Sequence, residues 1–275
     1  MIVHWITGYI RFKKGTIGGY MKTILFYFSA TGNSLTTARM LAEEWNECEL
    51  IPLASLNTQE KIIVQADNIG FVFPIYYSDM PYIMRQAISK MHFVNTSYIF
   101  SVCTCRGHYG NIAQRLNALL QERNQFLSLS RHICLPGNSR ISSLEQNAVM
   151  LALQRENVHI IAQELVNRPV ENYDNETVLT PSPVHHALNM RGMEAEENCI
   201  GCGICEKICP MGNIALTDEK PKFGENCCSC LACFHWCPKE AIWMSKGEEE
   251  IKRRFKYHHP EVSLKDILNQ KEKTS

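Results

Sequence analysis

Runs of apolar residues alternate with segments of helical periodicity over the first two thirds of the chain. Five runs have the length of a strand, at residues 23–28, 49–53, 68–73, 97–103 and 132–135. The first reads T-I-L-F-Y-F, and such continuous apolar sequence is typical of a strand that is buried on both faces of a parallel sheet. The pattern therefore predicts a five-stranded parallel sheet.

The segments between and after these runs carry apolar residues at helical spacing, at residues 38–45, 84–91, 112–120 and 158–165. We expect Pro81 to open the second helix, a long last helix to begin near Ser143, and Pro169 to end it. Strands that alternate with helices predict an α/β, doubly wound domain, and we place it at residues 21–169.

Cysteine organises a second, smaller region at residues 197–246. The motif C-x2-C-x2-C-x3-C-P occurs twice in it, first as Cys199, Cys202, Cys205 and Cys209 and then as Cys227, Cys230, Cys233 and Cys237. Asn198 and Ile214 recur at the same offset as Asn226 and Ile242. The region is therefore an internal duplication of one short unit, and we expect a small α+β domain.

The close spacing lets the first three thiolates of each motif converge on one [4Fe–4S] cluster, while the fourth ligates the other cluster. This rule assigns one cluster to Cys199, Cys202, Cys205 and Cys237, and the other to Cys227, Cys230, Cys233 and Cys209. The alternatives are zinc, which usually takes two C-x2-C pairs per site, and disulfides, which need an oxidising compartment. Two complete motifs that both end in Cys-Pro favour the clusters.

This stretch resembles the two-cluster bacterial ferredoxins over about fifty residues. Cys228 lies within the second motif but outside its register. We interpret it as a free thiol near the cluster, with a replacement ligand as the alternative.

Composition limits the classes of function. The 275 residues are 45% hydrophobic, and 28 Lys and Arg balance 28 Asp and Glu, so no bulk attraction to nucleic acid or to membranes is implied. No apolar run approaches the length of a membrane span. The cysteines outside the two motifs show no spacing pattern, and unpaired thiols beside iron–sulfur ligands indicate a reducing, cytoplasmic setting. These cysteines are Cys48, Cys103, Cys105, Cys134 and Cys228.

The loop after the first strand reads S-A-T-G-N-S at residues 29–34. Its hydroxyl groups, a glycine, and backbone N–H groups at a helix N-terminus suit a phosphate without a lysine. It matches neither the Walker loop nor G-x-G-x-x-G. Taken alone, it is equally well explained as an ordinary helix cap.

Two later loops lie at the same edge of the predicted sheet, where ligands of such folds bind. They offer aromatic rings for stacking and glycines for close approach of the backbone. Their members are Pro74, Ile75, Tyr76 and Tyr77 after the third strand, and Thr104, Cys105, Arg106, Gly107, His108, Tyr109 and Gly110 after the fourth.

The first of these loops looks like the phosphate loop of flavodoxins, and the resemblance covers about residues 21–168. It implies a flavodoxin-like fold that binds FMN, with the two later loops around the isoalloxazine ring. On the phosphate it implies Ser29, Thr31, Gly32, Asn33 and Ser34. Arg106 and His108 depart from the family, because many flavodoxins place acidic residues there.

The order of a flavodoxin-like part and a two-cluster ferredoxin part resembles fusion proteins of anaerobes, and the sequence Y-H-H-P-E-V at residues 257–262 is similar to that group. Residues 1–20 are expected to be a leader without patterned core, with Met21 as the real start. Residues 170–196 are expected to be a linker and 247–275 a charged tail with a solvated helix. The pairs His185-His186 and His258-His259 are expected to be surface histidines.

Two redox sites in one chain predict an electron-transfer protein of the oxidoreductase class. We expect it to relay electrons between FMN, two [4Fe–4S] clusters and redox partner proteins, such as a ferredoxin-type donor or a reductase. One alternative is a flavin-site reductase of a small acceptor, either a quinone or a nitroaromatic compound. Another is a redox-sensing scaffold module. A pocket over the flavin ring favours the reductase, whereas a ring edge on a flat surface favours the relay.

Overall fold

A five-stranded parallel sheet forms the centre of the α/β part. The computed structural model describes residues 9–11, 21–45, 47–138, 143–173, 193–244 and 256–272. The strand order is β3-β2-β5-β7-β8, which is the doubly wound order of flavodoxin-like folds. The predicted sheet is confirmed, with β2 at Thr23–Tyr27, β3 at Cys48–Pro52, β5 at Asn68–Pro74, β7 at Tyr98–Cys105 and β8 at Leu129–Cys134.

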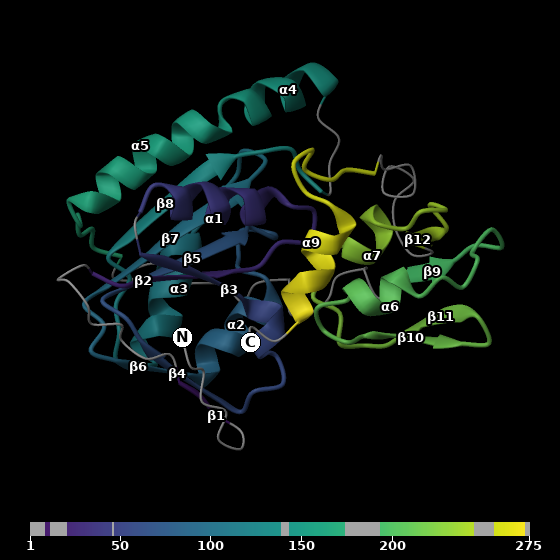
Figure 1. Ribbon diagram of the computed structural model, residues 1–275, viewed down its shortest axis with the longest axis horizontal. Coiled ribbons are helices and arrows are strands. Elements are labelled where there is room, and N and C mark those ends of the chain that lie inside the picture. Colours follow the sequence, from purple (N-terminus) through teal and green to yellow (C-terminus); the bar gives the residue numbers. More distant parts are fainter. Residues whose placement is uncertain are drawn as a thin grey trace.

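Helices cover both faces of this sheet (Figure 1). One face carries α1 and α5, and the other carries α2 and α3; the bounds are Asn33–Glu43, Gln154–Val166, Tyr82–Lys90 and Ile112–Gln121. Pro81 precedes α2 as expected. The long helix expected from Ser143 is two helices, because α4 (Leu144–Ala152) ends before Leu153 and α5 begins after it. A short 3₁₀ helix, η1 (Leu53–Leu56), follows β3.

A second, three-stranded sheet was not predicted. β4 (Lys61–Gln65) pairs in parallel with β6 (Met91–Val94) and with β1 (Tyr9–Arg11). The helical pattern had included Met91, but α2 ends at Lys90 and Met91 begins a strand without an intervening turn. β1 belongs to the expected leader, and the rest of that leader lies outside the described residues.

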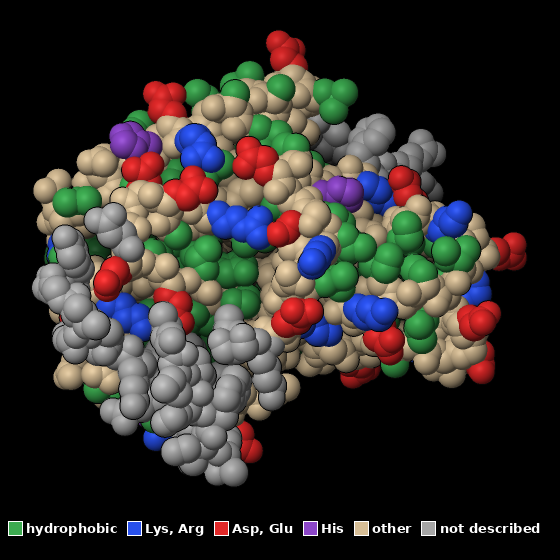
Figure 2. Space-filling model, in the orientation of Figure 1, with side chains coloured by type: hydrophobic (Ala, Val, Ile, Leu, Met, Phe, Trp, Pro, Cys, Tyr) green, Lys and Arg blue, Asp and Glu red, His purple; other side chains and the backbone are tan. Residues whose placement is uncertain are grey.

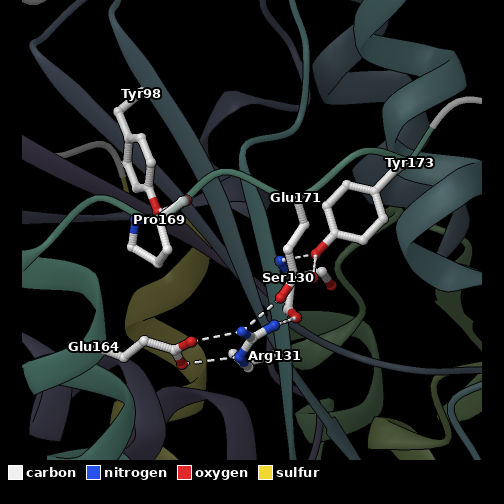
Figure 3. Close-up of polar contacts among 7 residues, drawn as sticks. All are labelled: Tyr98, Ser130, Arg131, Glu164, Pro169, Glu171 and Tyr173. Carbon is white, nitrogen blue, oxygen red and sulfur yellow. Dashed lines mark hydrogen bonds and ion pairs between the residues drawn. The ribbon is translucent and has the colours of Figure 1, made fainter.

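The edge strand β8 is fixed by a polar network at its outer side (Figure 3). The Arg131 guanidinium donates to Glu164 of α5 at 2.8 Å and 2.5 Å, and to Glu171 at 2.7 Å. The Ser130 N–H donates to the Tyr173 hydroxyl at 2.8 Å, and that hydroxyl donates to Glu171. The start of the expected linker is therefore attached to the sheet.

The cysteine-rich part forms a separate lobe beside the carboxyl edge of the sheet (Figure 1). Its outer strands β9 (Met193–Ala195) and β12 (Ile242–Met244) pair antiparallel, as do β10 (Ile214–Thr217) and β11 (Lys220–Phe223). Each motif contains one short helix, which begins two residues after the second cysteine and includes the third; these helices are α6 at Ile204–Ile208 and α7 at Ala232–His235. The small α+β lobe agrees with the predicted duplication.

The C-terminal segment, which we define as residues 256–272, lies at the junction of the two parts, with α9 (Leu264–Leu268) between them (Figure 1). It ends in the 3₁₀ helix η3 (Asn269–Lys271). Residues 174–192 of the linker, with His185-His186, and residues 245–255 of the predicted solvated helix lie outside the described residues. In the parts that the structure describes, no helix is both long and apolar enough to cross a bilayer.

Candidate functional site

The three predicted loops meet in one hollow at the carboxyl edge of the sheet. The hollow is lined by Ser29, Ala30, Thr31, Asn33 and Ser34, by Pro74, Ile75 and Tyr76, by Thr104, Cys105 and Arg106, and by Pro136, Gly137 and Asn138. The last three residues follow β8 and were missed by the sequence analysis. That loop contains a proline and a glycine but no motif, so only its position at the same sheet edge could have indicated it.

The first loop is tightly folded around the N-terminus of α1. The Gly32 N–H donates to the Ser29 hydroxyl at 3.1 Å, and α1 begins directly after Gly32. Ser34 and Thr104 share one hydrogen bond between their hydroxyl groups at 2.8 Å, so one of their two hydroxyl hydrogens is left for a ligand. The helix dipole and these donors suit an anion in the hollow.

The backbone of this loop is held from behind by residues more than two hundred positions away. The Gln270 side chain accepts from the Ser29 N–H at 3.1 Å and donates to the Ser29 carbonyl at 2.9 Å. The His259 N–H donates to the Thr31 carbonyl at 2.7 Å, and the Trp236 indole N–H donates to the Ala30 carbonyl at 2.9 Å. Three consecutive loop residues are thus fixed by the C-terminal segment and by the cysteine-rich lobe.

Gly32 and Asn33 complete this contact. Gly32 has a φ of 105°, and a Cβ there would lie 2.8 Å from the His259 Cβ and 2.9 Å from Val262, so the C-terminal segment approaches too closely for any side chain. The Asn33 amide donates to the Pro136 carbonyl at 2.8 Å and accepts from the Tyr257 hydroxyl at 2.6 Å. The Asn33 side chain therefore connects the phosphate loop to the loop after β8 and to the C-terminal segment. Because its amide is used in these bonds, the backbone N–H of Asn33 is the group that it can offer to an anion.

The expectation of a surface histidine at His259 was wrong. Its side chain is 2% exposed, and its Nε2 donates to the Gln154 side chain at 2.7 Å while its Nδ1 accepts from the Glu261 N–H. Burial lowers the pKa of His259, which favours this neutral form. His258 is exposed, as expected, and stacks on Trp236 with ring centroids 4.0 Å apart. The polar residues around His259 gave no indication that it is buried. The sequence Y-H-H-P-E-V had been singled out only for its similarity to a group of fusion proteins.

A second, larger hollow of about 450 Å³ adjoins the first. It shares Ile75, Tyr76, Cys105, Arg106 and Asn138 with the first hollow, and adds Tyr77, Ser78, Gly107, His108, Ser229 and Leu231. Ser229 and Leu231 come from the second cysteine motif, so the two parts of the chain form this hollow together. Of the predicted stacking residues, Tyr77 is 51% exposed at its rim, whereas Tyr109 lies on His132 with centroids 4.0 Å apart.

In the cysteine-rich lobe, one cavity is lined by the predicted first ligand set. Cys199, Cys202 and Cys205 line it together with Cys237, which belongs to the second motif. One cysteine of the second motif thus shares a cavity with three cysteines of the first. Burial raises the pKa of Cys205 to about 11, and a coordinated metal would instead favour its thiolate.

The predicted second ligand set is more deeply buried. Cys209 and Cys230 are 8% and 6% exposed, and burial and then the nearby Cys230 raise the pKa of Cys209. Backbone N–H groups already point at sulfur atoms of this set, from Asn213 to Cys209 and from Ser229 to Cys227, each at 3.3 Å. Such donors stabilise cluster thiolates. Among the described residues, no three His, Cys, Asp or Glu side chains are arranged to hold a single metal ion.

The second motif, and not the first, faces the hollows. The Asn138 amide donates to the Cys230 carbonyl at 3.2 Å and to the Tyr76 hydroxyl at 3.4 Å, and His235 of α7 donates from Nε2 to the Asn138 carbonyl at 2.9 Å. Burial, and then Cys230 and Cys228, raise the pKa of Tyr76. Hydrophobic side chains are visible on the surface of the cysteine-rich lobe (Figure 2), and in the first motif Ile200 is 59% exposed.

One comparison with known families matches the cysteine-rich part. Residues 195–215 match the model of the 4Fe-4S binding domain family. The comparison with curated proteins gave no match.

Among solved structures, a candidate flavoprotein from Bacteroides uniformis is similar, with 21% identity, 42% of this chain and 90% of that chain covered, and a TM-score of 0.33. A candidate flavoprotein from Bacteroides eggerthii has 16% identity, with 54% and 99% covered and a TM-score of 0.35. An NAD(P)H:quinone oxidoreductase from Methanothermobacter marburgensis has 11% identity, with 57% and 99% covered and a TM-score of 0.33. These scores are too low to support more, and the fold class rests on the strand order given above.

Proposed function

We propose that this chain is a cytoplasmic electron-transfer protein that binds FMN and two [4Fe–4S] clusters and exchanges electrons with redox partner proteins. The match of residues 195–215 to a 4Fe-4S binding family and the flavodoxin-like strand order support this proposal. When bound, FMN takes up two electrons and releases them singly, while each cluster carries one, so together they convert between paired and single electrons.

The first hollow fits the phosphate of FMN. Its donors would be the hydroxyl groups of Ser29, Thr31 and Ser34 and the backbone N–H groups that begin α1. The Arg106 side chain lines both hollows and supplies positive charge toward an anionic ligand. The ring would lie in the second hollow, between Tyr76, Tyr77 and the third loop, where His108 replaces the acidic residues of many flavodoxins.

The two cysteine sets fit two clusters. Cys199, Cys202, Cys205 and Cys237 would hold one cluster, which we call the outer cluster because its cavity shares no lining residue with the two hollows. Cys227, Cys230, Cys233 and Cys209 would hold the inner cluster. Cys228 would remain a thiol, since it donates a hydrogen bond to Cys230 that lowers the pKa of Cys230.

The contact that carries the proposal is the Asn138 bridge. One amide group joins the backbone of a predicted inner-cluster ligand, Cys230, to the Tyr76 hydroxyl on the wall of both hollows. Electron transfer slows steeply with distance, so a fusion of two redox sites is useful only if they are held close. The Trp236 and His235 contacts fix the same arrangement from the α7 side.

Rapid photoreduction of the clusters in the intact protein tests this function. Flavin reduction is expected to be first-order and independent of protein concentration, because both sites belong to one molecule. Asn138→Ala is expected to slow it, whereas Asn57→Ala, which removes another bond between the two parts, from Asn57 to the Pro210 carbonyl, is the matched control. A rate that rises with protein concentration would contradict transfer within the molecule and favour a redox-sensing scaffold.

The second hollow supports one alternative function, reduction of a small acceptor such as a quinone or nitroaromatic compound at the flavin. Its volume of about 450 Å³ is within the range of ligand pockets. Steady-state assays with reduced ferredoxin and a series of acceptors separate the two functions. Saturation with a small acceptor, weakened by Tyr77→Ala at the rim, would favour the reductase; turnover only with protein acceptors would favour the relay.

A further inference from the structure

Two neighbouring strands of the central sheet both end in cysteine. Cys105 is the last residue of β7 and Cys134 the last residue of β8, and the two are register partners in the parallel sheet. Adjacent strands lie about 4.8 Å apart. Disulfides need Cα atoms about 4.4–6.8 Å apart, so the backbone spacing is compatible with a bond between these two residues.

The side chains of the pair lie on one face of the sheet. Ser101 and Ser130 are also register partners on the same strands, and their hydroxyl groups hydrogen bond at 2.8 Å. Side chains alternate with a period of two along a strand, so Cys105 and Cys134, four residues further on in each strand, share that face. The Arg131 network holds β8 in this register from the other face (Figure 3).

The two sulfur atoms have different surroundings. Cys105 is 8% exposed and lines both hollows, whereas Cys134 is exposed to solvent. Burial, and then the neighbouring Cys134, raise the pKa of Cys105 to about 11. The Cys134 sulfur can therefore be reached by a disulfide from solution, and it lies beside the protonated Cys105 sulfur at the wall of the candidate flavin site.

We propose that Cys105 and Cys134 form a redox-active pair that exchanges with disulfides from solution and is reduced again by the flavin. The Cys134 thiolate attacks one sulfur of a disulfide RSSR, which releases RS⁻ and forms a mixed disulfide. Cys105, losing its proton to the solvent, then attacks the Cys134 sulfur and releases the second RS⁻. In total, two thiols and RSSR give the Cys105–Cys134 disulfide and two RSH.

Reduction of this disulfide back to two thiols takes two electrons and two protons. The reduced flavin in the hollow would supply the electron pair, and this second half of the cycle rests on the proposed function. The substrate class is a low-molecular-weight or protein disulfide. The alternative is two neighbouring thiols that never form a bond. Cys103 on the same face is fully buried beside His132 and serves as a comparison.

The test equilibrates the full-length protein anaerobically with glutathione buffers of increasing oxidised fraction, followed by acid quenching, alkylation of free thiols and peptide mapping. The expected result is a peptide that links Cys105 to Cys134, formed with the slope of a two-electron couple and absent in Cys134→Ser. Cys103→Ala is the matched control and is expected to retain the linked peptide. A lasting glutathione adduct on Cys134 of the unmodified protein, or both cysteines alkylated in the most oxidising buffer, would overturn the pair.

A second measurement separates this proposal from the proposed function. Photoreduction of the flavin in protein that contains the Cys105–Cys134 disulfide is expected to restore both free thiols. A reduced flavin with the disulfide still intact would overturn the electron exchange between them. If the protein binds no flavin, the proposed function fails, whereas the glutathione titration still decides whether the cysteines form a redox pair.

Discussion

The two cysteine motifs have the same spacing but different surroundings. The first half of the first motif is open to solvent, with Cys202 exposed and Ile200 59% exposed. The second lies against the α/β part, where Cys230 is 6% exposed and its carbonyl accepts from Asn138. Spacing therefore determines which ligands can meet, while the residues between and after the cysteines determine what each site faces.

The two motifs have the same backbone conformation at equivalent positions, but the residues packed around those positions differ. Gly201 and Ser229 occupy equivalent positions and have φ values of 65° and 57°. A Cβ on Gly201 would lie 2.7 Å from the Glu219 carbonyl oxygen, whereas Ser229 accommodates its side chain at the wall of the second hollow. Ser229 keeps a left-handed conformation that favours glycine, which indicates that its side chain serves the junction between the two parts.

The largest effect is expected from replacing the fourth cysteine of a motif, which we assign to the cluster of the other motif. Cys237→Ala, in the second motif, should remove the outer cluster, because Cys237 lines the cavity of Cys199, Cys202 and Cys205. Iron and sulfide content should fall by about half, and the remaining EPR signal should match that of Cys202→Ala.

Cys228→Ser is the control, and its iron content should stay unchanged. A Cys237→Ala signal that matches Cys230→Ala instead would mean that each motif holds its own cluster with its own four cysteines. In that case the crossing of ligands is wrong.

Substitution at Gly201 should have a smaller effect. Gly201→Ala is expected to lower the free energy of unfolding by about 2 kcal/mol, because the left-handed backbone and the contact with Glu219 both oppose a Cβ. Ser229→Gly should leave stability within about 1 kcal/mol of the original, since a glycine relieves the backbone at that position. Urea denaturation under anaerobic conditions measures both; equal losses would show that the surroundings of the two motifs do not differ in energy.

The smallest effect is expected for the bond from the second motif to the phosphate loop. Trp236→Phe removes the hydrogen bond to the Ala30 carbonyl, whose net contribution is about 1 kcal/mol. We therefore expect FMN to bind about fivefold more weakly. Trp243→Phe, on β12 of the outer sheet, is the matched control. Fluorescence titration of the flavin gives both dissociation constants. An unchanged Trp236→Phe value would mean that the lobe does not shape the flavin site.

Short-range sequence patterns predicted the strands of the main sheet and the cysteine-rich region, because both are encoded in neighbouring residues. The buried runs gave all five strands of the main sheet, and the cysteine spacing indicated the four cysteines that line one cavity of the lobe. β6 was missed because Met91 satisfies the period of the preceding helix, and β4 because five residues of alternating burial carry a weak signal.

The contacts around the phosphate loop could not be predicted in the same way. Gln270 and Ser29 lie 241 positions apart, and neither residue has a pattern that indicates the other. His259 reads as a surface residue from its sequence, and its contacts with Gln154 and with the phosphate loop, far away in the chain, account for its burial. The loop that contains Asn138 carries no motif. Tertiary packing, rather than periodicity, brings these residues to the site.

The distance along the chain between Ser29 and Gln270 also has a consequence for biosynthesis. Translation proceeds from the N-terminus, and the sheet can begin to form while the later residues are still being added. When the ribosome has just completed residues 29–34, none of Trp236, His259 and Gln270 has been made, and these hold the loop in shape. Loading of a ligand into this loop is therefore a late event in the life of the chain. A polypeptide that stalls before Trp236 would carry the loop sequence without any of these supports.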